Sequence, residues 1–363
     1  MSNSNIFKNF LSVYRQNQFP VLQNRVYSSA EEARDCVLGD IDIVQDLDTG
    51  LIFNAAFKSD LMVYDANYNN EQGFSRVFKK HLNWVAHTIE THFGKQNLIE
   101  VGCGKGFFLE LLLSLGFKIT GFDSTYDGTN PKIIKRNFEP GIIKSPARGL
   151  ILRHVLEHIL NPINFLSELK KSNGDQGLIY IEVPCFDWIM KNRTWFDIFY
   201  EHVNYFRLDD LKRMFGRVVK CGHCFDDQYL YVIADLSTLC QPKYNEACKL
   251  LFPENFLVNL NSTQERQQRI EEKKDVAVWG GGSKGVIFSL LRERMGLPIN
   301  IVIDINPSKQ GKFLPVTGLK VYSPSQAMMI LKDGATVYVM NPNYLAEVKE
   351  MTNHRFNYAE ANQ

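Results

Sequence analysis

The sequence predicts an α/β protein with a small β-rich N-terminal part and two Rossmann-like units, because three patterns follow one another along its 363 residues. Two short runs of alternating hydrophobicity come first. Apolar strands then alternate with helical stretches as far as Asp235, and a second strand, glycine turn, helix and strand begin at Val276. We therefore expect three domains, over residues 1–73, 74–240 and 241–363.

Local patterns predict the segments that surround the first unit. Residues 41–54 hold two alternating runs around an Asp-Leu-Asp-Thr-Gly turn, which predicts a β-hairpin in the first domain. The pattern becomes helical over residues 74–93. Residues 261–275 are highly polar, which predicts an exposed connecting helix before the last α/β unit.

The central unit contains a glycine-rich turn between two strands at nucleotide-binding spacing. Three glycines follow the apolar strand 98–101: Gly102, Gly104 and Gly106. Glycines let the backbone turn sharply and approach a ligand closely, and a helix is expected from Phe107. The next strand, residues 118–122, ends in Asp123, where an acidic residue accepts ribose hydroxyls in nucleotide-binding folds.

Glu100 determines which nucleotide this turn favours. Its carboxylate at the end of the first strand would repel a phosphate but can hold the ammonium group of a methionyl moiety. The pattern therefore favours S-adenosylmethionine (SAM) over two alternatives, an NAD site and a turn without a ligand. The residues expected to contact SAM are Glu100, Gly102, Cys103, Gly104, Gly106, Asp123, Arg153 and His154.

Composition and charge limit the partners that the sequence favours. Lys plus Arg number 41 and Asp plus Glu number 40, so we expect no general attraction to nucleic acid or to a membrane surface. No apolar run approaches the roughly 20 residues of a membrane span, and no signal-peptide pattern is present, so we expect a cytoplasmic protein. The seven scattered cysteines predict reduced thiols, and the oligomeric state is left open.

Two groups of potential metal ligands are not interpreted as metal sites. His154 and His158 follow the apolar strand 150–152, one helical turn apart, but zinc needs a third protein ligand and none stands out nearby. This segment is interpreted as a wall of the SAM pocket, at the carboxyl edge of the sheet. Cys221 and Cys224 form a Cys-x-x-Cys pair, but they follow a polar turn and lead into a strand, unlike a redox pair at a helix start.

Residues 179–206 combine a strand, a Glu-Val-Pro turn and many aromatic and titratable side chains, which is typical of a substrate pocket. His202 has an ordinary pKa of about 6.5 and is the candidate general base, with the neighbouring Glu201 expected to fix its tautomer. Tyr200 and Tyr205 add hydroxyl groups. The alternative interpretation is an aromatic core with a hydrogen-bonded histidine.

A second glycine turn, Gly-Gly-Gly-Ser-Lys-Gly over residues 280–285, opens the C-terminal unit. The elements predicted around it are strand 276–279, helix 286–293 and strand 300–303, which ends in Asp304. Because Lys284 adds positive charge and no carboxylate precedes the turn, the pattern favours a phosphate-bearing ligand, either NAD or a sugar nucleotide, over a turn without a ligand. The expected substrate contacts are Gly281, Gly282, Ser283, Lys284, Asn306 and Lys309.

With these residues the chain resembles, over nearly its whole length, the three-part sugar C-methyltransferases. The motifs that carry the resemblance are SSAEEARDCVLGDIDIVQDLDTGLIFN, IEVGCGKG, RHVLEH, IEVP, YEHVNYF, WGGGSKG and VIDINPSKQGKFLP. These enzymes methylate carbon 3 of nucleotide-linked 4-keto-6-deoxyhexoses. The resemblance implies a zinc-binding-like first domain, a central SAM domain and a C-terminal Rossmann-like domain, with the sugar nucleotide between them. It also implies that Glu100 and Asp123 hold SAM and that His202 is the base.

The chain departs from this family at two points. The family carries paired Cys-x-x-Cys motifs in its first domain, whereas here Asp46 and Thr49 replace the second pair and residues 1–20 contain no cysteine. A closed zinc site has four protein ligands, so we expect no zinc. Phe199 stands where the family has the tyrosine of a Tyr-His-Glu-His string. The residues that can supply the missing hydroxyl are Tyr200, Tyr68 and Tyr64.

The function that these observations favour is SAM-dependent methyl transfer to a nucleotide-linked keto-deoxy sugar, through an enolate that His202 forms. The nearest alternative is O-methylation of a sugar, because a histidine base also serves a hydroxyl. Two alternatives belong to other classes: an NAD-dependent oxidoreductase that uses the second glycine turn and Asp304, and a protein that binds SAM or a sugar nucleotide without catalysis.

Overall fold

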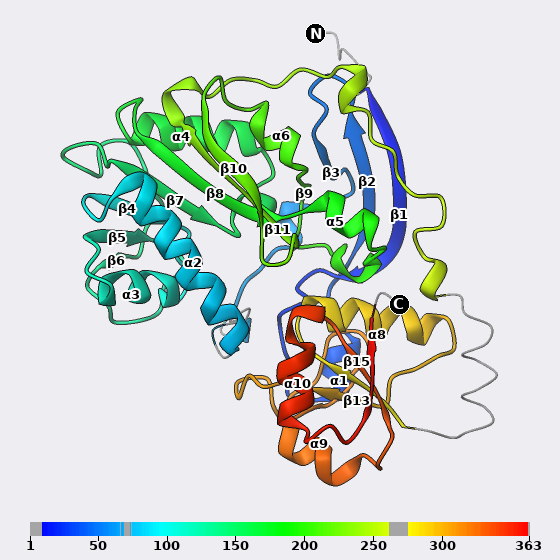
Figure 1. Ribbon diagram of the computed structural model, residues 1–363. Helices are drawn as coiled ribbons and strands as arrows, with labels where there is room; N and C mark the ends of the chain where they lie inside the picture. The colour runs from blue at the N-terminus through cyan, green and yellow to red at the C-terminus, as the bar shows by residue number, and fades with distance from the viewer. Residues whose placement is uncertain (1–8, 66, 69–72, 74, 261–274, 362–363) are drawn as a thin grey trace.

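The computed structural model describes residues 9–65, 67–68, 73, 75–260 and 275–361 (Figure 1). They form three β-sheets and the helices that cover them, a mixed α/β fold as predicted. Two predicted features lie outside the described residues: Phe74, at the start of the predicted helix, and residues 261–274, most of the predicted connecting helix. No helix in the described part of the chain is long and apolar enough to cross a membrane.

The first sheet is antiparallel, with the strand order β1-β2-β3-β9. Its strands are β1 (Phe10–Pro20), β2 (Leu38–Asp46), β3 (Ile52–Asn54) and β9 (Asn204–Tyr205). The predicted hairpin is confirmed as β2 and β3, and the Thr49 hydroxyl closes its turn by donating to Asp46 Oδ2 over 2.7 Å. Because β9 begins two residues after His202, this sheet holds that part of the chain in place.

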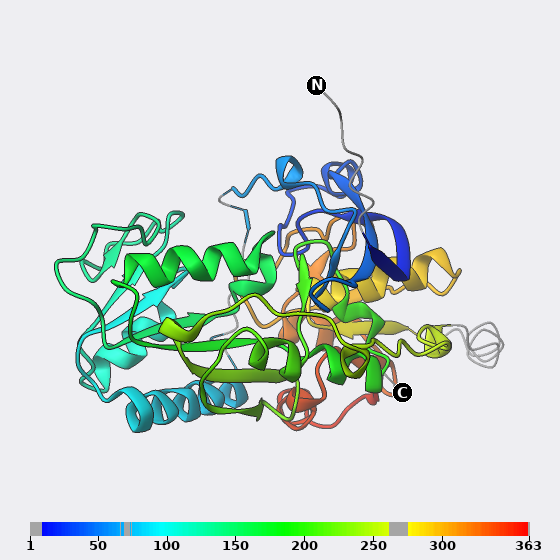
Figure 2. The same ribbon diagram turned by 90° about the horizontal axis from the view of Figure 1, so that it is seen from above.

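The second sheet is the doubly wound sheet that the alternation of strands and helices predicts. Its order is β10-β11-β8-β7-β4-β5-β6, and only β11 runs antiparallel to its neighbours. The strands are β4 (Leu98–Val101), β5 (Ile119–Phe122), β6 (Ile133–Ile134), β7 (Gly149–Arg153), β8 (Leu178–Pro184), β10 (Val218–Cys224) and β11 (Tyr229–Asp235). The helices are α2 (Arg76–Phe93), α3 (Phe107–Ser114), α4 (Pro162–Ser172), α5 (Phe186–Lys191) and α6 (Leu208–Lys212). Figure 2 shows α2 and α4 on opposite faces of this sheet.

The third sheet is parallel throughout and is the predicted second Rossmann-like unit. Its order is β14-β13-β12-β15-β16. The strands are β12 (Val276–Trp279), β13 (Ile301–Ile303), β14 (Val321–Tyr322), β15 (Thr336–Val339) and β16 (Asn357–Glu360). The helices are α8 (Ser283–Arg294), α9 (Pro324–Ile330) and α10 (Leu345–Met351). In Figure 1 this sheet lies below the other two.

The three sheets share buried contacts, which hold their edges together. Trp195, between α5 and β9, stacks on Phe288 of α8 with ring centroids 5.3 Å apart and planes at 6°. The short helix α1 (Ala30–Arg34), which follows β1 in sequence, packs on the C-terminal unit, where Val316 N donates to Ala33 O over 2.8 Å. The segment between β1 and α1 therefore passes between the first and third sheets.

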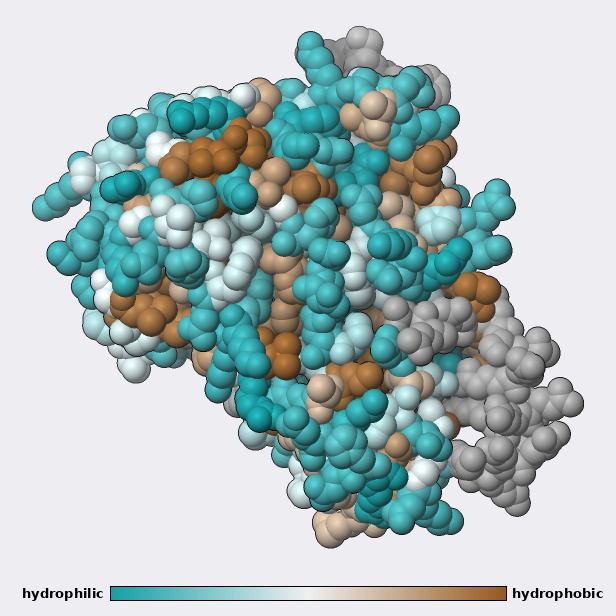
Figure 3. All heavy atoms as spheres, in the orientation of Figure 1, coloured by the Kyte–Doolittle hydropathy of each residue, from teal (hydrophilic) through white to brown (hydrophobic). Residues whose placement is uncertain are grey.

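The surface view contains no broad apolar area on the face that it shows. In Figure 3 the hydrophobic side chains of the described residues form small separate patches among hydrophilic ones. A large continuous apolar patch would indicate a docking surface, and isolated hydrophobic residues do not. The face shown in Figure 3 therefore carries no sign of an apolar docking surface among the described residues.

Candidate functional site

The loop after β4 has left-handed backbone and one position that faces open space. Gly102, Gly104 and Gly106 have φ angles of 70°, 55° and 85°. A Cβ atom at position 102 would lie 2.4 Å from Val155 Cγ2, so the loop packs tightly against the segment after β7. A Cβ atom at position 104 would meet no atom within 4 Å. Position 104 is therefore where a ligand can approach the backbone.

Gly104→Ala and Gly116→Ala test this loop as a matched pair. Both glycines have a positive φ and open space around the missing side chain, but Gly116 lies beyond α3, outside the glycine turn. We expect each variant to lose about 1–2 kcal/mol of stability through backbone strain. Only Gly104→Ala should also lose affinity for S-adenosylhomocysteine, by roughly tenfold or more in calorimetry, because its methyl group occupies the approach of the ligand. Equal affinities of the two variants would contradict this placement of the ligand.

Glu100 in β4 is a buried carboxyl group without a partner. The residue is 3% exposed, and its Oε2 atom has no hydrogen bond to any residue that the structure describes. Burial raises the pKa of this carboxyl to about 8; the Arg153 guanidinium opposes the rise and Asp123 adds to it. A buried carboxylate is costly without a counter-charge, so the site fits a ligand that brings a cationic group, as the ammonium of SAM would.

Asp123 stands just after β5, beside the same loop. Its Oδ2 accepts a hydrogen bond from Gly104 N over 2.8 Å, and its Oδ1 accepts from Thr125 N over 2.9 Å and from the Thr125 hydroxyl over 2.7 Å. These bonds fix the carboxylate at the carboxyl edge of the sheet, where doubly wound folds bind nucleosides. Because a carboxylate has about four acceptor positions, Asp123 can still receive a ribose hydroxyl.

Cys103 and Arg153, two of the predicted SAM contacts, lie beneath the glycine loop and not on its open side. Cys103 is 9% exposed, and its Sγ lies only 2.7 Å from where a Cβ atom of Gly121 would stand, so the thiol packs beneath the loop. Arg153 donates to Glu182 Oε1 through Nη2 over 2.7 Å, which makes it part of the support below the site. His154 Nε2 lies 3.2 Å from the same oxygen but outside hydrogen-bond geometry, and the His154 ring reaches the cavity described next.

Glu182 in β8 is the centre of this support. Its Oε1 also accepts from His81 Nε2 of α2 over 3.1 Å, and its Oε2 accepts from the Tyr180 hydroxyl over 2.6 Å. Burial acts to raise the pKa of Glu182, but Arg153, His81 and His154 outweigh it and hold the pKa well below its ordinary value. The sequence contains Glu182 in the Glu-Val-Pro turn but gives no sign of this network, because its members lie on different elements.

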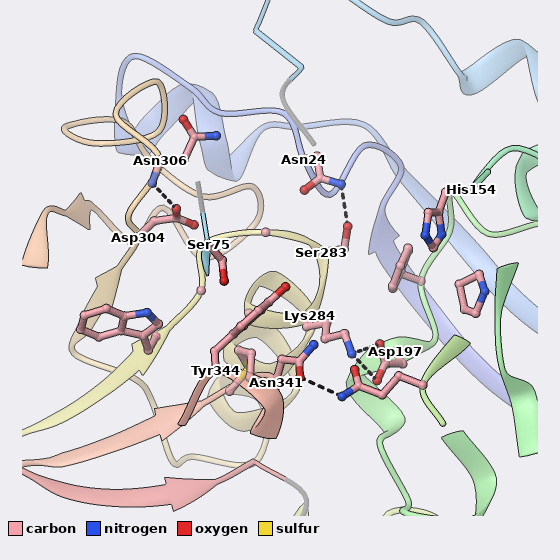
Figure 4. Close-up of a pocket in the computed structure, with 18 of the residues that line it drawn as sticks. Asn24, Ser75, His154, Asp197, Ser283, Lys284, Asp304, Asn306, Asn341 and Tyr344 are labelled. Carbon is pink, nitrogen blue, oxygen red and sulfur yellow. Dashed lines mark hydrogen bonds and ion pairs between the residues drawn. The ribbon is translucent and has the colours of Figure 1, made fainter. Parts of the chain in front are cut away.

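A cavity of about 270 Å³ opens where the three sheets meet (Figure 4). Figure 4 shows Asn24 beside Ser283 and Asp197 facing Lys284 across its walls. The polar residues that line it include Asn24, Tyr68, His154, Glu157, His158, Asp197, Glu201, His202, Lys284, Asp304, Lys309 and Asn341. Its wall at His154 adjoins Val155, which packs on the first glycine loop, so the cavity lies next to the predicted SAM site.

His202 lines this cavity as a half-buried imidazole. Its ring packs on Phe199, with ring centroids 4.0 Å apart, and it has no hydrogen bond to any described side chain. Burial lowers the pKa of His202 well below its ordinary value, and the cationic forms of His158 and His154 and the ammonium of Lys284 lower it further. The imidazole is therefore neutral at physiological pH and can accept a proton.

The structure differs from the prediction that Glu201 orients His202. The Glu201 carboxylate instead accepts hydrogen bonds from Gln23 N over 2.6 Å, Asn24 N over 3.2 Å and the Tyr68 hydroxyl over 2.6 Å. It thereby ties the segment between β1 and α1 to the cavity wall. Only the backbone of Glu201 contacts a histidine, since its carbonyl oxygen accepts from His158 Nδ1 over 2.8 Å.

Of the tyrosines that the sequence suggested as hydroxyl donors, only Tyr68 lines the cavity. Tyr200 is fully buried, and its hydroxyl accepts from Lys58 N over 2.7 Å, so it is turned away towards the first sheet. The Tyr205 hydroxyl contacts the backbone of the segment before His202. Tyr64 is 43% exposed and packs edge-on against Tyr68. A catalytic role for Tyr200 or Tyr64 therefore does not fit their positions.

Glu157 joins His158 and His202 in a cluster that the sequence analysis did not foresee. One possible ligand atom from each residue lies within 4.8 Å of the others, and all three residues line the cavity. Glu157 is 1% exposed, and neither carboxylate oxygen is in hydrogen-bond geometry with a described residue, although His154 Nδ1 lies 3.4 Å from Oε1. Burial acts to lower the pKa of His154, but Glu157 and Glu182 outweigh it and raise that pKa above its ordinary value.

The second glycine turn is built for close packing. A Cβ atom at Gly285 would lie 1.8 Å from Gly280 O, so only glycine lets α8 approach β12 this closely. α8 begins at Ser283, earlier than the predicted start at residue 286. The first N–H groups of a helix have no partner within the helix, and the residues of this first turn, Ser283, Lys284 and Gly285, line the cavity.

Two lysines beside this turn have different surroundings. Lys284 is paired with Asp197, with Nζ and Oδ1 2.8 Å apart. Lys309 is 4% exposed, and among the described residues its ammonium donates to two neutral oxygens, Gly281 O at 3.3 Å and Asn24 Oδ1 at 3.4 Å. Burial lowers the pKa of Lys309. Asp304 and Glu201 partly oppose this lowering, so of the two lysines Lys309 is the one that lacks a close carboxylate and can accept an anionic ligand.

Five of the cavity residues were absent from the predicted site, and of these five only Glu157 lies in a quoted motif, RHVLEH. They are Asn24, Glu157, Asp197, Gln228 and Asn341. Gln228 Nε2 donates to Asn341 Oδ1 over 2.8 Å, which joins the second and third sheets. Such contacts between distant segments leave no local pattern, so no sequence signal was available for them.

Comparisons with known proteins find similarity to methyltransferases in the central part of the chain. Residues 70–218 match the family model of a methyltransferase domain. A protein from Pyrococcus horikoshii OT3 is similar in structure, with 10% identity, a TM-score of 0.36 and coverage of 48% of this chain and 99% of that chain. A SAM-dependent methyltransferase from Aquifex aeolicus has 18% identity, a TM-score of 0.31 and coverage of 42% and 89%. The plantazolicin methyltransferase BpumL, in complex with S-adenosylhomocysteine, has 15% identity, a TM-score of 0.33 and coverage of 44% and 83%. A comparison with the curated proteins gives no match.

Proposed function

We propose that the protein uses SAM to transfer a methyl group to a nucleotide-linked keto-deoxy sugar, because residues 70–218 match the family model of a methyltransferase domain and include most of the doubly wound sheet. The observation that carries this proposal is the cavity between the three sheets. It joins His202 and Tyr68 to the second glycine turn, and it adjoins the segment that packs on the SAM loop. An acceptor with a phosphate-bearing end and a reactive sugar end suits such a cavity.

The phosphate end is proposed to lie at Lys309 and the start of α8. Lys309 is a buried cation with no carboxylate within ion-pair distance among the described residues; burial lowers its pKa, and the more distant Asp304 and Glu201 only partly oppose this. A diphosphate would bring the missing anionic contact and would also accept from the N–H groups of the helix start. The Lys284 ammonium is held by Asp197 and is the weaker candidate.

Lys309→Met tests the phosphate site. Removal of the ammonium should weaken the binding of nucleoside diphosphates by roughly tenfold to a hundredfold, because hydrogen bonds to charged groups contribute about 1.5–3 kcal/mol. S-adenosylhomocysteine affinity should stay unchanged in the same calorimetric titrations. Lys332→Met, at an exposed lysine before β15, is the matched control and should alter neither affinity. A diphosphate affinity equal to that of the wild type would place the phosphates elsewhere.

His202 is the proposed base. A ketone acidifies the C–H group next to it, and a neutral imidazole on the cavity wall can take that proton. The carboxylate of Glu157 stabilises the imidazolium that results. The Tyr68 hydroxyl, which lines the same cavity, is the proposed donor for the enolate oxygen, and it must exchange its bond to Glu201 for that oxygen. SAM, when bound, would supply the methyl group from its sulfonium to the enolate carbon, and S-adenosylhomocysteine would be the leaving group.

O-methylation of a sugar hydroxyl is a second candidate, and one observation favours it. Phe199 stands where a tyrosine would offer a further hydroxyl beside His202, and Tyr68 already donates to Glu201. A site with few free donors stabilises an enolate less well, whereas deprotonation of a hydroxyl needs only the base.

Two measurements test these proposals in order. Calorimetric titration with S-adenosylhomocysteine, with NAD as the control ligand, checks the cofactor site before any acceptor is known. Incubation of 4-keto-6-deoxy sugar nucleotides with the protein in D₂O then separates the two reactions. C-methylation predicts His202-dependent deuterium exchange at the carbon next to the ketone, and O-methylation predicts methyl transfer without exchange. Absence of methyl transfer to any sugar nucleotide would contradict the proposed acceptor.

A further inference from the structure

We propose that Asp304 binds the sugar hydroxyls of a nucleoside, so that the third sheet holds the nucleoside part of the acceptor. This inference rests on the proposed function, in which the acceptor is a sugar nucleotide. It goes beyond the phosphate site at Lys309 and α8, because a phosphate site does not distinguish a nucleoside diphosphate from pyrophosphate.

The first support is that Asp304 repeats the construction of Asp123 in the other Rossmann-like unit. Asp123 Oδ2 accepts from the glycine-loop amide Gly104 N over 2.8 Å, and its Oδ1 accepts from the amide two residues further on over 2.9 Å. Asp304 Oδ2 accepts from the glycine-loop amide Gly281 N over 2.7 Å, and its Oδ1 accepts from Asn306 N, also two residues further on, over 2.8 Å. The two carboxylates are thus fixed in the same way beside the two glycine turns.

The second support is the position of Asp304 in the third sheet. All strands of this sheet are parallel, but the chain places β13 on one side of β12 and β15 on the other, so the order of the strands reverses at β12. Ligands of such sheets bind at this point, at the carboxyl ends of the strands. Residues from the ends of all three strands line the cavity: Gly280, Gly282, Asp304, Ile305, Met340 and Asn341. Gly280, Gly282 and Gly285 also have the G-x-G-x-x-G spacing of nucleotide-binding turns, with Asp304 after the following strand.

The third support is electrostatic. A carboxylate next to a phosphate group repels it, so a site for phosphate alone gains nothing from Asp304. A carboxylate that already accepts two backbone N–H groups keeps acceptor positions for hydroxyl groups, which are neutral donors. Burial lowers the pKa of Lys309 and the nearby Asp304 opposes this, so the site combines a carboxylate that favours hydroxyls with an ammonium that favours anions.

This arrangement orients the acceptor. The nucleoside would lie over the ends of β12, β13 and β15, with the diphosphate at the start of α8. The sugar would then extend towards His202, which lines the same cavity. NAD carries the same ribose chemistry, so NAD is the other source of such a nucleoside, and the experiment must separate the two.

Asp304→Asn and Asp123→Asn in the full chain form the test, because each carboxylate serves as the control for the other. Affinities are measured by calorimetry for S-adenosylhomocysteine, NAD, inorganic pyrophosphate and a panel of UDP, GDP, CDP, ADP and dTDP. Asp304→Asn should weaken the tightest nucleoside diphosphate by roughly tenfold to a hundredfold and leave S-adenosylhomocysteine affinity intact. Asp123→Asn should do the reverse. Pyrophosphate should bind Asp304→Asn as well as the wild type or more tightly, because a negative charge is removed.

Each outcome decides the proposal. Retained or raised nucleoside diphosphate affinity in Asp304→Asn would overturn the role of Asp304 while leaving the proposed acceptor class intact. Loss of both ligands in that variant would also overturn it, since the carboxylate would then only hold the fold. If the wild type binds NAD and none of the diphosphates, the proposed acceptor class fails. The nucleoside role of Asp304 is then decided by NAD alone: weaker NAD binding in Asp304→Asn supports this role, and unchanged binding overturns it. If the wild type binds none of these nucleotides, both proposals fail.

Discussion

His202→Ala is expected to lower methyl transfer by about 10²–10⁴-fold, the usual contribution of general-base catalysis. S-adenosylhomocysteine affinity should change little, because the imidazole lines the acceptor cavity and the glycine loop of the SAM site lies beyond Val155. The measurement is turnover with a sugar nucleotide together with calorimetry for the cofactor product. Loss of both activity and cofactor affinity would show that His202 belongs to the cofactor site.

The matched control for His202 is His87→Ala, at an exposed position of α2. It removes an imidazole of the same size from a surface that has no contact with the cavity, so activity and affinity should both remain at the wild-type level. In D₂O the His202 variant should also lose deuterium exchange at the carbon next to the ketone. Exchange that persists in His202→Ala would assign proton removal to another group, for which Glu157 and His158 are the neighbours.

Glu100→Gln is expected to remove the pH dependence of cofactor binding. Burial raises the pKa of Glu100 to about 8, so in the free protein most of this carboxyl is protonated at pH 7. A cationic ligand favours the ionised form, and the wild type should therefore release a proton on binding and gain affinity as the pH rises towards 8. Calorimetry in buffers of different ionisation enthalpy measures that proton. Glu110→Gln, on the exposed face of α3, should behave as the wild type.

Glu100 should also affect the stability of the free protein in a defined pH window. Its folded-state pKa of about 8 lies above the ordinary value of 4.5, so the fold favours the protonated carboxyl. The stabilisation is complete below about pH 4.5 and is lost as the pH rises towards 8, at most about 1.4 kcal/mol per pH unit. Glu100→Gln cannot ionise and should keep its free energy of unfolding over this window. Urea unfolding of both proteins at pH 5 and pH 8 compares them, and parallel pH dependences would contradict the raised pKa.

The sequence by itself determined the strands that precede the two glycine turns and so place each turn at the carboxyl edge of its sheet. The predicted strands 98–101 and 276–279 coincide with β4 and β12, because short apolar runs next to glycine turns have one favourable arrangement in a doubly wound sheet. For the same reason the sequence predicted that Glu100, Asp123 and Asp304 stand beside the two glycine turns. A residue at the end of a parallel strand lies at the carboxyl edge of the sheet, where ligands bind, whichever distant residues surround it.

The tertiary structure alone decided which side chains face the cavity and what each of them contacts. Glu201 is next to His202 in sequence, but its carboxylate points to Gln23, Asn24 and Tyr68. Glu157, which the sequence analysis passed over, lies near His202 although 45 residues separate them (202 − 157). Adjacent residues of an irregular turn point in different directions, and partners from distant segments meet only when the sheets pack together. Local pattern therefore fixes the position of a residue along its element, and packing decides its partner.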